Sequence, residues 1–316
     1  MIVVTGGAGF IGSNLVQALN QRGREDIIVV DDLADGRKLL NLVDCEIYDL
    51  VDKDVFAGWL AEGRDLGEKI DVLFHQGADS NTMEWDGAAL LRSNYDYSKS
   101  LLSYCAGQKV RLVYASSGSV YGRGPVFKEE RQFENPLNPY AYSKFLFDQL
   151  VRRLSPGIRT QVAGLRYFNV YGPREAHKGG MASVAFKLRE QLLESGVVKL
   201  FEGSDGYADG DQRRDFVWVG DCVAVNLWLL DHPEVSGVFN VGTGRAQSFN
   251  DVARAVIDHF GRGVIEYVPM PEALDGRYQS YTQADIGALR DAGYDAPFLS
   301  VEQGVQQYMK WLEARG

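Results

Sequence analysis

The chain has 316 residues, 45% of them hydrophobic, which is enough apolar material for one large domain or two closely associated ones. Its formal net charge of −10 argues against a nucleic-acid partner, which normally requires a basic face. No apolar run has the length of a membrane span, and the opening MIVVTGGAGF lacks a cationic signal region. The three cysteines and four histidines show no metal-ligand spacing, so we expect no metal site and a reducing, cytoplasmic location.

Short apolar runs alternate with helical patterns through the first half of the chain. MIVVTG, DIIVVDD, DVLFHQGA and VRLVYASSG are continuous β-rich runs, of the kind that forms strands buried on both faces of a parallel sheet. Between them, GSNLVQALNQRG and NYDYSKSLLSYCAGQ have helical patterns. This alternation predicts an α/β fold with a Rossmann-type, doubly wound parallel sheet.

A glycine-rich turn follows the first expected strand. Gly6, Gly9 and Gly12 in VVTGGAGFIGS have GxxGxxG spacing at the opening of a helix. Such glycines let the backbone approach a pyrophosphate closely, while N–H groups at the helix N-terminus point toward it. A tight turn with no ligand is the alternative for the glycines alone. Their position between a strand and a helix favours dinucleotide binding.

The second expected strand ends in two acidic residues, Asp31 and Asp32. An acidic residue at this position normally accepts hydrogen bonds from the adenosine ribose and disfavours a 2′-phosphate. Lys38 and Lys53 follow, and these cations could hold that phosphate instead, unless they belong to a solvated loop. These residues therefore leave the choice between NAD and NADP open.

The stretch YAYSK places Tyr140 and Lys144 four residues apart, on one face of an expected helix. Lys144 can hold the nicotinamide ribose and lower the phenol pKa of Tyr140, which can then accept a carbinol proton. YxxxK alone occurs by chance in many helices. Here it follows the expected strand end YASSGSVYG, where Ser117 can hydrogen-bond the same substrate oxygen.

The composition of the chain changes after residue 170, where the expected loops become richer in glycine and charged residues. RDFVWVGD and GVFNVGTG still have the pattern of strands that could return to the first domain. We therefore expect a Rossmann domain for NADP over 1–170 and about 216–243. A smaller, discontinuous α/β substrate domain should cover about 171–215 and 244–316.

The motifs TGGAGFIG, SSGSVYG, YxxxK and RYFNVYGPR together resemble the extended short-chain dehydrogenase/reductase family of nucleotide-sugar enzymes. The resemblance runs from residue 1 to beyond residue 240 and assigns catalysis to Ser117, Tyr140 and Lys144. Sugar 4,6-dehydratases of this family carry Thr-Asp-Glu or a close variant at the serine site. This chain has Ser117-Gly118-Ser119 there, so water elimination is poorly supported.

Further stretches, RYFNVYGPREAHKGGMASVAF, KLFEGSD, RRDFVWVGD and GRYQSYTQAD, are similar to the epimerases of this family that act on an ADP-linked heptose. This resemblance implies conversion of ADP-D-glycero-D-manno-heptose to ADP-L-glycero-D-manno-heptose by inversion at C6, with tightly bound NADP. Because the carbinol C–H is not acidic, inversion requires transient oxidation to a ketone and return of the same hydride to its other face.

The two faces of the ketone place its oxygen in different positions, so a single phenol would serve one epimer badly. The resemblance assigns Lys178 as a second acid/base opposed to Tyr140. Proximity to an oxidised, positively charged nicotinamide would lower the lysine pKa, which suits proton exchange. Binding of a substrate phosphate is the alternative role for Lys178.

The resemblance also implies two sets of binding residues. The cofactor set comprises Gly6, Gly9, Phe10, Ile11, Gly12, Asp31, Asp32, Lys38, Lys53, Gln76, Gly77, Ala78, Asp79, Ser80, Ser93, Lys144, Val170 and Lys178. The substrate set comprises Asn169, Gly180, Lys187, Phe201, Glu202, Gly203, Ser204, Arg214 and Tyr278. Four positions depart from the family pattern. Gly180 stands in place of a serine, Lys187 in place of a histidine, and Ser93 and Asp32 each in place of an asparagine. A longer loop before Arg213 leaves open whether Arg213 or Arg214 clamps the diphosphate.

Two other functions fit the same residues less well. One is 4-epimerisation of a UDP-hexose on the same scaffold, and the other is nucleotide binding without catalysis. The resemblance further implies a homo-oligomer, either a pentamer or a decamer, and a role in lipopolysaccharide inner-core synthesis.

Overall fold

The computed structural model describes residues 1–64, 69–271 and 279–315. The chain divides into two compact units, which are described separately. The first comprises Met1–Val120, Pro136–Arg166 and Val223–Phe239, and the second comprises Tyr121–Asn135, Tyr167–Cys222 and Asn240–Gly316.

These units differ from the predicted domain boundaries chiefly at Tyr121–Asn135, which belongs to the second unit. Asn240 explains this grouping: its Oδ1 accepts a 2.7 Å hydrogen bond from the Tyr121 hydroxyl, and its Nδ2 donates to the Phe127 carbonyl at 2.7 Å. These contacts join segments more than 100 residues apart in sequence, so the local pattern does not reveal them. The assignment of functions to the two domains stays a prediction.

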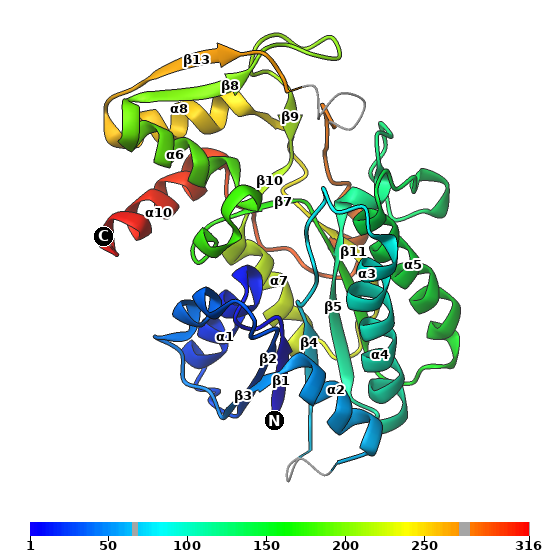
Figure 1. The fold of residues 1–316 in the computed structure, drawn as a ribbon. Helices are drawn as coiled ribbons and strands as arrows, with labels where there is room; N and C mark the ends of the chain where they lie inside the picture. The colour runs from blue at the N-terminus through cyan, green and yellow to red at the C-terminus, as the bar shows by residue number, and fades with distance from the viewer. Residues whose placement is uncertain (65–68, 272–278, 316) are drawn as a thin grey trace. The chain divides into compact units, whose positions relative to one another are not determined.

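A sheet of seven described strands, in the order β11-β6-β5-β4-β1-β2-β3, forms the centre of the first unit (Figure 1). Its strands are β1 (Ile2–Thr5), β2 (Ile27–Asp31), β3 (Asp49–Asp52), β4 (Val72–His75), β5 (Arg111–Ser117), β6 (Val162–Tyr167) and β11 (Gly237–Val241). β1 pairs in parallel with β2 on one side and with β4 on the other. The chain therefore proceeds outward from β1 in both directions, which confirms the predicted doubly wound fold.

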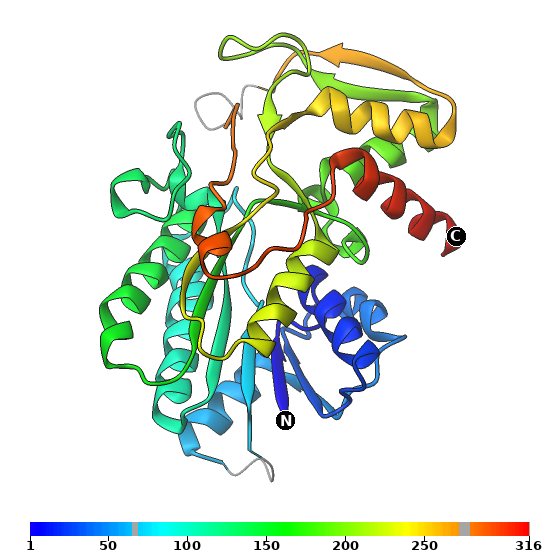
Figure 2. The same cartoon turned by 180° about the vertical axis from the view of Figure 1, so that it is seen from behind.

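Helices cover both faces of this sheet (Figures 1 and 2). One face carries α2 (Lys53–Glu62), α4 (Tyr97–Gln108) and α5 (Pro139–Leu154), and the other carries α1 (Phe10–Gln21) and α7 (Val219–Asp231). Shorter helices are η1 (Gly36–Leu42), α3 (Gly87–Leu90), the π-helix η2 (Leu91–Asp96), η3 (Gly118–Tyr121), η4 (Arg131–Phe133) and η5 (Ser155–Gly157). Apolar side chains of β1, β2, β4, α2, α4 and α5 form one buried cluster. Because the strands are buried on both faces, they have the continuous apolar sequences that made them predictable.

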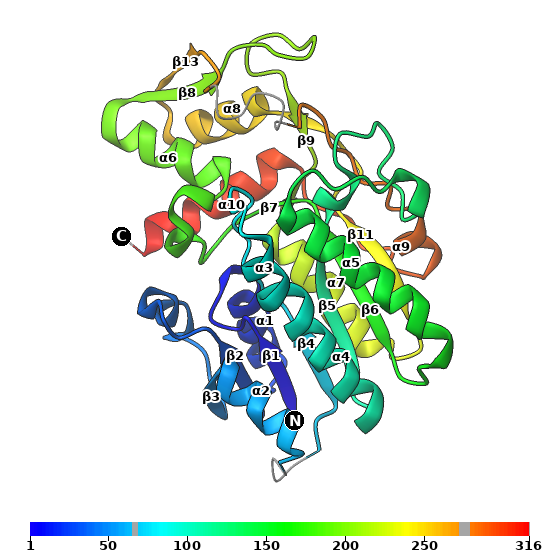
Figure 3. The ribbon, with the colours of Figure 1, turned by 45° about the vertical axis from the view of Figure 1, so that its right-hand side comes forward.

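The second unit contains three two-stranded sheets and helices that pack beside them (Figure 3). The strand pairs are β7 (Asn169–Tyr171) with β10 (Phe216–Trp218), β8 (Val197–Phe201) with β13 (Val264–Val268), and β9 (Arg213–Arg214) with β12 (Gln247–Ser248). The helices are η6 (Ala176–Met181), α6 (Val184–Ser195), α8 (Phe249–Phe260), α9 (Gly287–Asp291) and α10 (Val301–Ala314). Side chains of α6, α8, α10 and β8 share a second buried cluster.

The sequence prediction for RDFVWVGD is wrong in one respect. Its strand, β10, pairs with β7 in the register Phe216↔Asn169 and takes no place in the central sheet. GVFNVGTG supplies β11, which does lie at the edge of that sheet. Both runs are equally β-rich, so only the partner strand decides where each one pairs. In the described ranges, no helix is both long and apolar enough to cross a membrane.

Candidate dinucleotide and catalytic site

The turn between β1 and α1 is a close backbone cradle that excludes side chains. Gly6 has φ +67°, and a Cβ on it would lie 2.4 Å from the backbone nitrogen of Gly77. A Cβ on Gly12 would lie 2.1 Å from the carbonyl oxygen of Gly6. Gly9 is the N-cap of α1, and Phe10 and Ile11 form its first turn. These residues fit the pyrophosphate of a dinucleotide, which needs bare backbone at a helix N-terminus.

A pocket of about 370 Å³ lies beside this cradle in the first unit. Its lining consists of Thr5, Gly6, Val30, Asp31, Asp32, Lys38, Lys53, Gly77, Ala78, Asp79, Ser93 and Tyr97. The glycine turn and this pocket together therefore contain most of the predicted cofactor residues. Ser80 is exposed. The side chain of Gln76 donates a 3.0 Å hydrogen bond to the side chain of Asn226, in the same unit. Val170 and Lys178 belong to the second unit.

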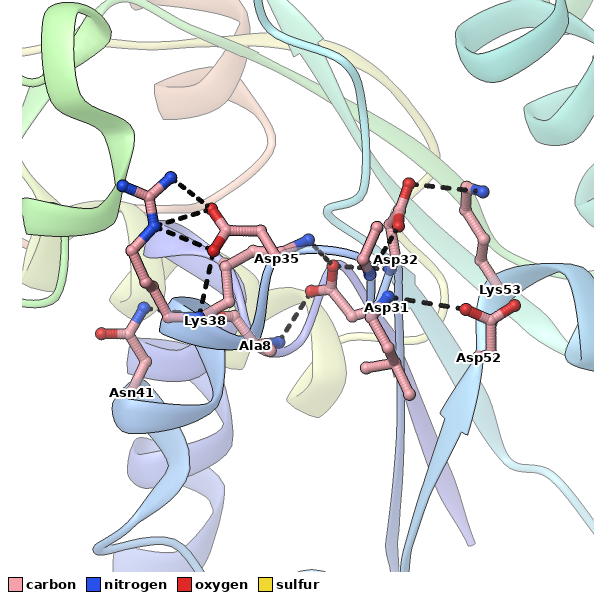
Figure 4. Close-up of polar contacts among 12 residues, drawn as sticks. Ala8, Asp31, Asp32, Asp35, Lys38, Asn41, Asp52 and Lys53 are labelled. Carbon is pink, nitrogen blue, oxygen red and sulfur yellow. Dashed lines mark hydrogen bonds and ion pairs between the residues drawn. The ribbon is translucent and has the colours of Figure 1, made fainter.

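Asp31 holds the end of β2 against the glycine turn (Figure 4). Its carboxylate accepts hydrogen bonds from the backbone nitrogens of Ala8 at 2.9 Å and Asp32 at 2.8 Å. It also forms an ion pair with Lys38 whose N···O distance is 2.5 Å. Asp31 is buried, so this carboxylate organises the cradle in addition to facing the pocket.

Asp32 is more exposed and forms an ion pair with Lys53 at 3.4 Å (Figure 4). The backbone N–H of Ala34 and the charge of Lys53 lower the pKa of Asp32, although partial burial opposes them. Burial lowers the pKa of Lys53, but hydrogen bonds and charges from Asp54 and Asp32 outweigh it and raise that pKa. Both lysines that could hold a 2′-phosphate are thus already next to carboxylates.

Ser117, Tyr140 and Lys144 come together at the end of β5 and the start of α5. Asn138 caps α5 by accepting a 2.8 Å hydrogen bond from the Ala141 nitrogen, and Pro139 occupies the first helical position. This places Tyr140 in the first turn, where it hydrogen-bonds Ser117, the last residue of β5. The ammonium of Lys144, one turn later, donates to the carbonyl of Ala115 at 2.9 Å.

The expected lowering of the phenol pKa is wrong for this structure. Burial raises the pKa of Tyr140, the hydrogen bond from Ser117 lowers it in part, and the charge of Asp79 adds to the rise. Lys144 is itself buried, which lowers its pKa to about 8, while Asp148 opposes that change. Burial of the phenol, which the sequence does not display, is the largest of these effects on the pKa of Tyr140.

Asn94 is a site residue that the sequence did not reveal. It lies in the π-helix η2, is buried, and accepts a 2.8 Å hydrogen bond from the backbone nitrogen of Asp79. Its amide donates to the Asp79 carbonyl at 2.9 Å and to the Ser143 hydroxyl at 3.1 Å. Ser143 in turn donates to the Tyr140 carbonyl at 2.7 Å. Asn94 therefore links the cofactor pocket to the helix that carries Tyr140, and π-helical turns are frequent at such sites.

A second unpredicted group, His75, ends β4 beside the pocket. Its Nδ1 shares a 2.6 Å hydrogen bond with Thr5, and its Nε2 shares one of 2.7 Å with Ser98. Burial, with a smaller contribution from the charge of Lys144, lowers the pKa of His75 to about 3. The ring is neutral and has a partner at each nitrogen, so it serves as a spacer between β1 and α4.

Lys178 lies in η6 in the second unit, and its backbone nitrogen bonds to the carbonyl of Glu175. Burial lowers its pKa, Glu175 opposes this change, and Lys187 reinforces it. The direction agrees with the sequence prediction, but the main cause is desolvation. The Lys187 ammonium donates to the carbonyl of Gly180 at 2.5 Å, and a Cβ on Gly180 would meet no atom within 4 Å. Space for the serine of the family pattern is therefore present.

The predicted substrate stretch 201–204 is held in place by hydrogen bonds from Gln212 and Gly210 and by close backbone packing at Gly203. Gly203 cannot carry a side chain, because a Cβ would lie 2.3 Å from the Tyr207 carbonyl oxygen. Gln212 donates to the carbonyl of Glu202 at 2.8 Å and to the Ser204 hydroxyl at 3.2 Å. The Phe201 carbonyl accepts a 3.0 Å bond from Gly210. Tyr278, the remaining member of the predicted substrate set, lies outside the described residues.

Asp215 organises the surroundings of Asn169 and Arg214, and the sequence did not identify it. Its buried carboxylate accepts bonds from Thr243, Gly244 and Ala284 at 2.7–3.0 Å. Burial raises its pKa, and those hydrogen bonds oppose the rise. Its carbonyl accepts a 3.0 Å bond from the Asn169 nitrogen. Arg214 is buried with its guanidinium 5.7 Å from the Phe249 ring, while Arg213 is exposed.

Comparison with known proteins agrees with this geometry. Residues 2–242 match the model of the NAD dependent epimerase/dehydratase family. The chain is 59% identical over 309 residues to an ADP-L-glycero-D-manno-heptose-6-epimerase of Alkalilimnicola ehrlichii, and the match covers 98% of this chain and 96% of the relative. A solved Helicobacter pylori ADP-L-glycero-D-manno-heptose-6-epimerase has TM-score 0.84 and 30% identity, over 99% of this chain and 96% of that one. A Thermus thermophilus UDP-glucose 4-epimerase in complex with NAD has TM-score 0.81 and 28% identity, over 100% and 99% of the two chains.

Proposed function

The chain belongs to the NAD dependent epimerase/dehydratase family, and from that premise we propose that it inverts C6 of the heptose in ADP-D-glycero-D-manno-heptose. The product is ADP-L-glycero-D-manno-heptose, and the enzyme is an isomerase. The observation that carries the substrate assignment is the 59% identity, over 98% of the chain, to a heptose 6-epimerase. The glycine cradle and the Ser117–Tyr140–Lys144 group support the reaction type.

A nicotinamide cofactor, when bound, supplies the reversible oxidation that converts the C6 carbinol to a ketone and back. Gly6, Gly9 and Gly12 present bare backbone to its pyrophosphate, and the pocket beside them would receive its adenosine end. Lys144 would hold its nicotinamide ribose. The oxidation removes the need to take a proton from a carbon that is not acidic.

Tyr140 exchanges the hydroxyl proton of one epimer. Its phenol is hydrogen-bonded to Ser117, and the hydroxyl of Ser117 also accepts a 2.9 Å bond from Ser119. Ser117 can therefore orient the phenol and the substrate oxygen together. Because burial raises the pKa of Tyr140, loss of its proton depends on the charge of Lys144 in the loaded site.

Lys178 exchanges the proton of the other epimer. Burial lowers its pKa, which brings its neutral form closer to working pH and suits an amine that both gives and accepts a proton. Asn169 and Arg214, with the 201–204 stretch, would hold the ADP-sugar, and the buried Arg214 is the better diphosphate partner of the two neighbouring arginines.

NADP is the proposed cofactor because Lys38 and Lys53 both line the pocket that would receive a 2′-phosphate. Asp31 and Asp32 sit beside these cations and reduce the advantage of NADP over NAD. Asp31 contacts the glycine turn directly, so we assign it to the cradle and Asp32 to the specificity of the cofactor. The protein would act in the cytoplasm, as a homo-oligomer, in lipopolysaccharide inner-core synthesis.

Incubation with each nucleotide sugar, followed by NMR of the carbohydrate protons, tests the substrate assignment. We expect conversion of ADP-D-glycero-D-manno-heptose to its C6 epimer and no turnover of UDP-glucose. Turnover of UDP-glucose alone would favour a UDP-hexose 4-epimerase instead. Mass spectrometry of the nucleotide released by denaturing the purified protein identifies NADP or NAD.

A further inference from the structure

A buried polar group lies one helical turn beyond Lys144. Asp148 follows Lys144 by four residues and Tyr140 by eight, so all three side chains project from the same face of α5. Asp148 and Arg166 each have no exposed side-chain surface. Buried charges are rare unless they are paired, and Asp148 contributes its half of this pair from the helix that carries Tyr140 and Lys144.

The carboxylate of Asp148 receives hydrogen bonds from three other side chains. The guanidinium of Arg166, in β6, donates through Nε at 2.9 Å and approaches through Nη2 at 2.8 Å. Ser116 donates at 2.9 Å and Tyr114 at 3.0 Å, both from β5. Because Tyr114 and Ser116 alternate with Ala115 and Ser117, their bonds fix the end of the strand on which Ser117 stands.

The same strand also receives Lys144, whose ammonium donates to the carbonyl of Ala115 between the two Asp148 donors. The strand end, Lys144 and Asp148 therefore form one continuous polar contact between β5 and α5. Resting on the proposed function, we infer that Asp148 is a positioning residue, which fastens the catalytic helix to the Ser117 strand and sustains the positive charge of Lys144.

Among the residues that the structure describes in the first unit, few other groups favour the protonated form of Lys144. Burial lowers the pKa of Lys144 to about 8, and Asp148 is the group that raises it. His75, on β4, is neutral because its own pKa is about 3. Tyr140 is protonated in this environment, since burial raises its pKa. Arg166 and Arg152 act on the Tyr114 side of the network and add only positive charge.

The test compares Asp148→Asn with Asp96→Asn, which removes the same charge from an exposed pair with Lys99. The holoenzyme is exposed to acetic anhydride over a range of pH, and mass spectrometry measures the acetylation rate of Lys144. We expect the midpoint for Lys144 to fall by about 1 unit in Asp148→Asn, because a close opposite charge is lost. It should stay unchanged in Asp96→Asn. The alkaline limb of kcat/KM should move to lower pH by the same amount.

Two variants keep the result interpretable if Asp148→Asn does not fold. Asp148→Asn combined with Arg166→Gln removes both buried charges, and it should still lower the Lys144 midpoint. Tyr114→Phe removes one hydrogen bond and keeps the carboxylate, so it should lower the melting temperature without moving the midpoint. A wild-type Lys144 midpoint in folded variants that lack the Asp148 carboxylate would overturn the inference.

The acetylation measurement needs no substrate, so it separates this inference from the proposed function. A shifted midpoint in a protein that does not epimerise the heptose would support the role of Asp148 and refute the substrate assignment. Normal epimerisation with an unchanged Lys144 midpoint would support the substrate assignment and refute the role of Asp148.

Discussion

Replacement of Asp32 by Asn should increase the preference of this protein for NADP. Asp32 is 48% exposed and its carboxylate lies 3.4 Å from the ammonium of Lys53, one of the two cations proposed for the 2′-phosphate. The substitution removes that ion pair and a negative charge from the pocket. Asn retains an oxygen that can accept the N–H of Ala34, as Asp32 does at 3.0 Å, so the turn should be preserved.

The size of the effect follows from the exposure of the pair. An exposed ion pair contributes about 0–1 kcal/mol, and 1 kcal/mol corresponds to about a fivefold change in Kd. Removal of a like charge near the phosphate acts in the same direction, so the Kd for NADP should fall by about 3- to 10-fold. The Kd for NAD should change by less than about twofold, since NAD lacks the phosphate. The gain for NADP should shrink as salt increases.

Isothermal titration of cofactor-depleted protein with each dinucleotide measures both affinities. Asp35→Asn is the matched control, because Asp35 pairs with Arg37 in the same loop and caps η1, a position that Asn also favours. An equal gain for NAD and NADP, or the same gain in the control, would refute the proposal that Asp32 limits NADP binding.

Four further outcomes test the site. Tyr140→Phe should lower kcat by about 10²- to 10⁴-fold while the bound nucleotide is retained. NMR measures the turnover, and release of the nucleotide on denaturation measures its retention. Normal turnover would remove Tyr140 from the mechanism. Lys178→Met should lower kcat over a similar range, and undiminished epimerisation would leave the second acid/base unassigned. A pH profile of kcat/KM should fall as pH rises through about 8, because Lys144 loses its proton there, while a rate that stays constant to pH 10 would contradict a required ammonium. Gly12→Ala should abolish nucleotide retention, since its Cβ would lie 2.1 Å from a carbonyl oxygen. Gly36→Ala is the control, because a Cβ at that position would meet no atom within 4 Å. Equal nucleotide retention in the two variants would argue against the cradle.

Local patterns in the sequence were enough for the parts of this protein that depend on near neighbours. The four strands expected in the first half are present as β1, β2, β4 and β5, because each is a continuous apolar run buried on both faces. Gly6 and Gly12 were recognisable from their spacing between strand and helix. Tyr140 and Lys144 were recognisable because four residues make one helical turn.

Partners distant in the sequence escaped the same reasoning. β3 and β6 were not predicted, and β10 has an ordinary β-rich sequence whose partner, β7, only the folded chain supplies. Asn94 and His75 occur in unremarkable helical and strand patterns. Their importance comes from hydrogen bonds to residues 15 to 70 positions away, such as the bond between His75 and Thr5.

The sequence by itself determined four strands of the sheet, the glycine turn and the Tyr140–Lys144 pair, since these follow from periodicity and from the shapes of single residues. The resemblance to a known family assigned Lys178. The tertiary structure alone decided their electrostatics. It buried Tyr140 and raised a pKa that the charge of Lys144 was expected to lower. It also placed Asp148 against Arg166, 18 residues along the chain. Burial and the charges of residues distant in the sequence set the pKa of each of these groups, and both arise only when the chain has folded.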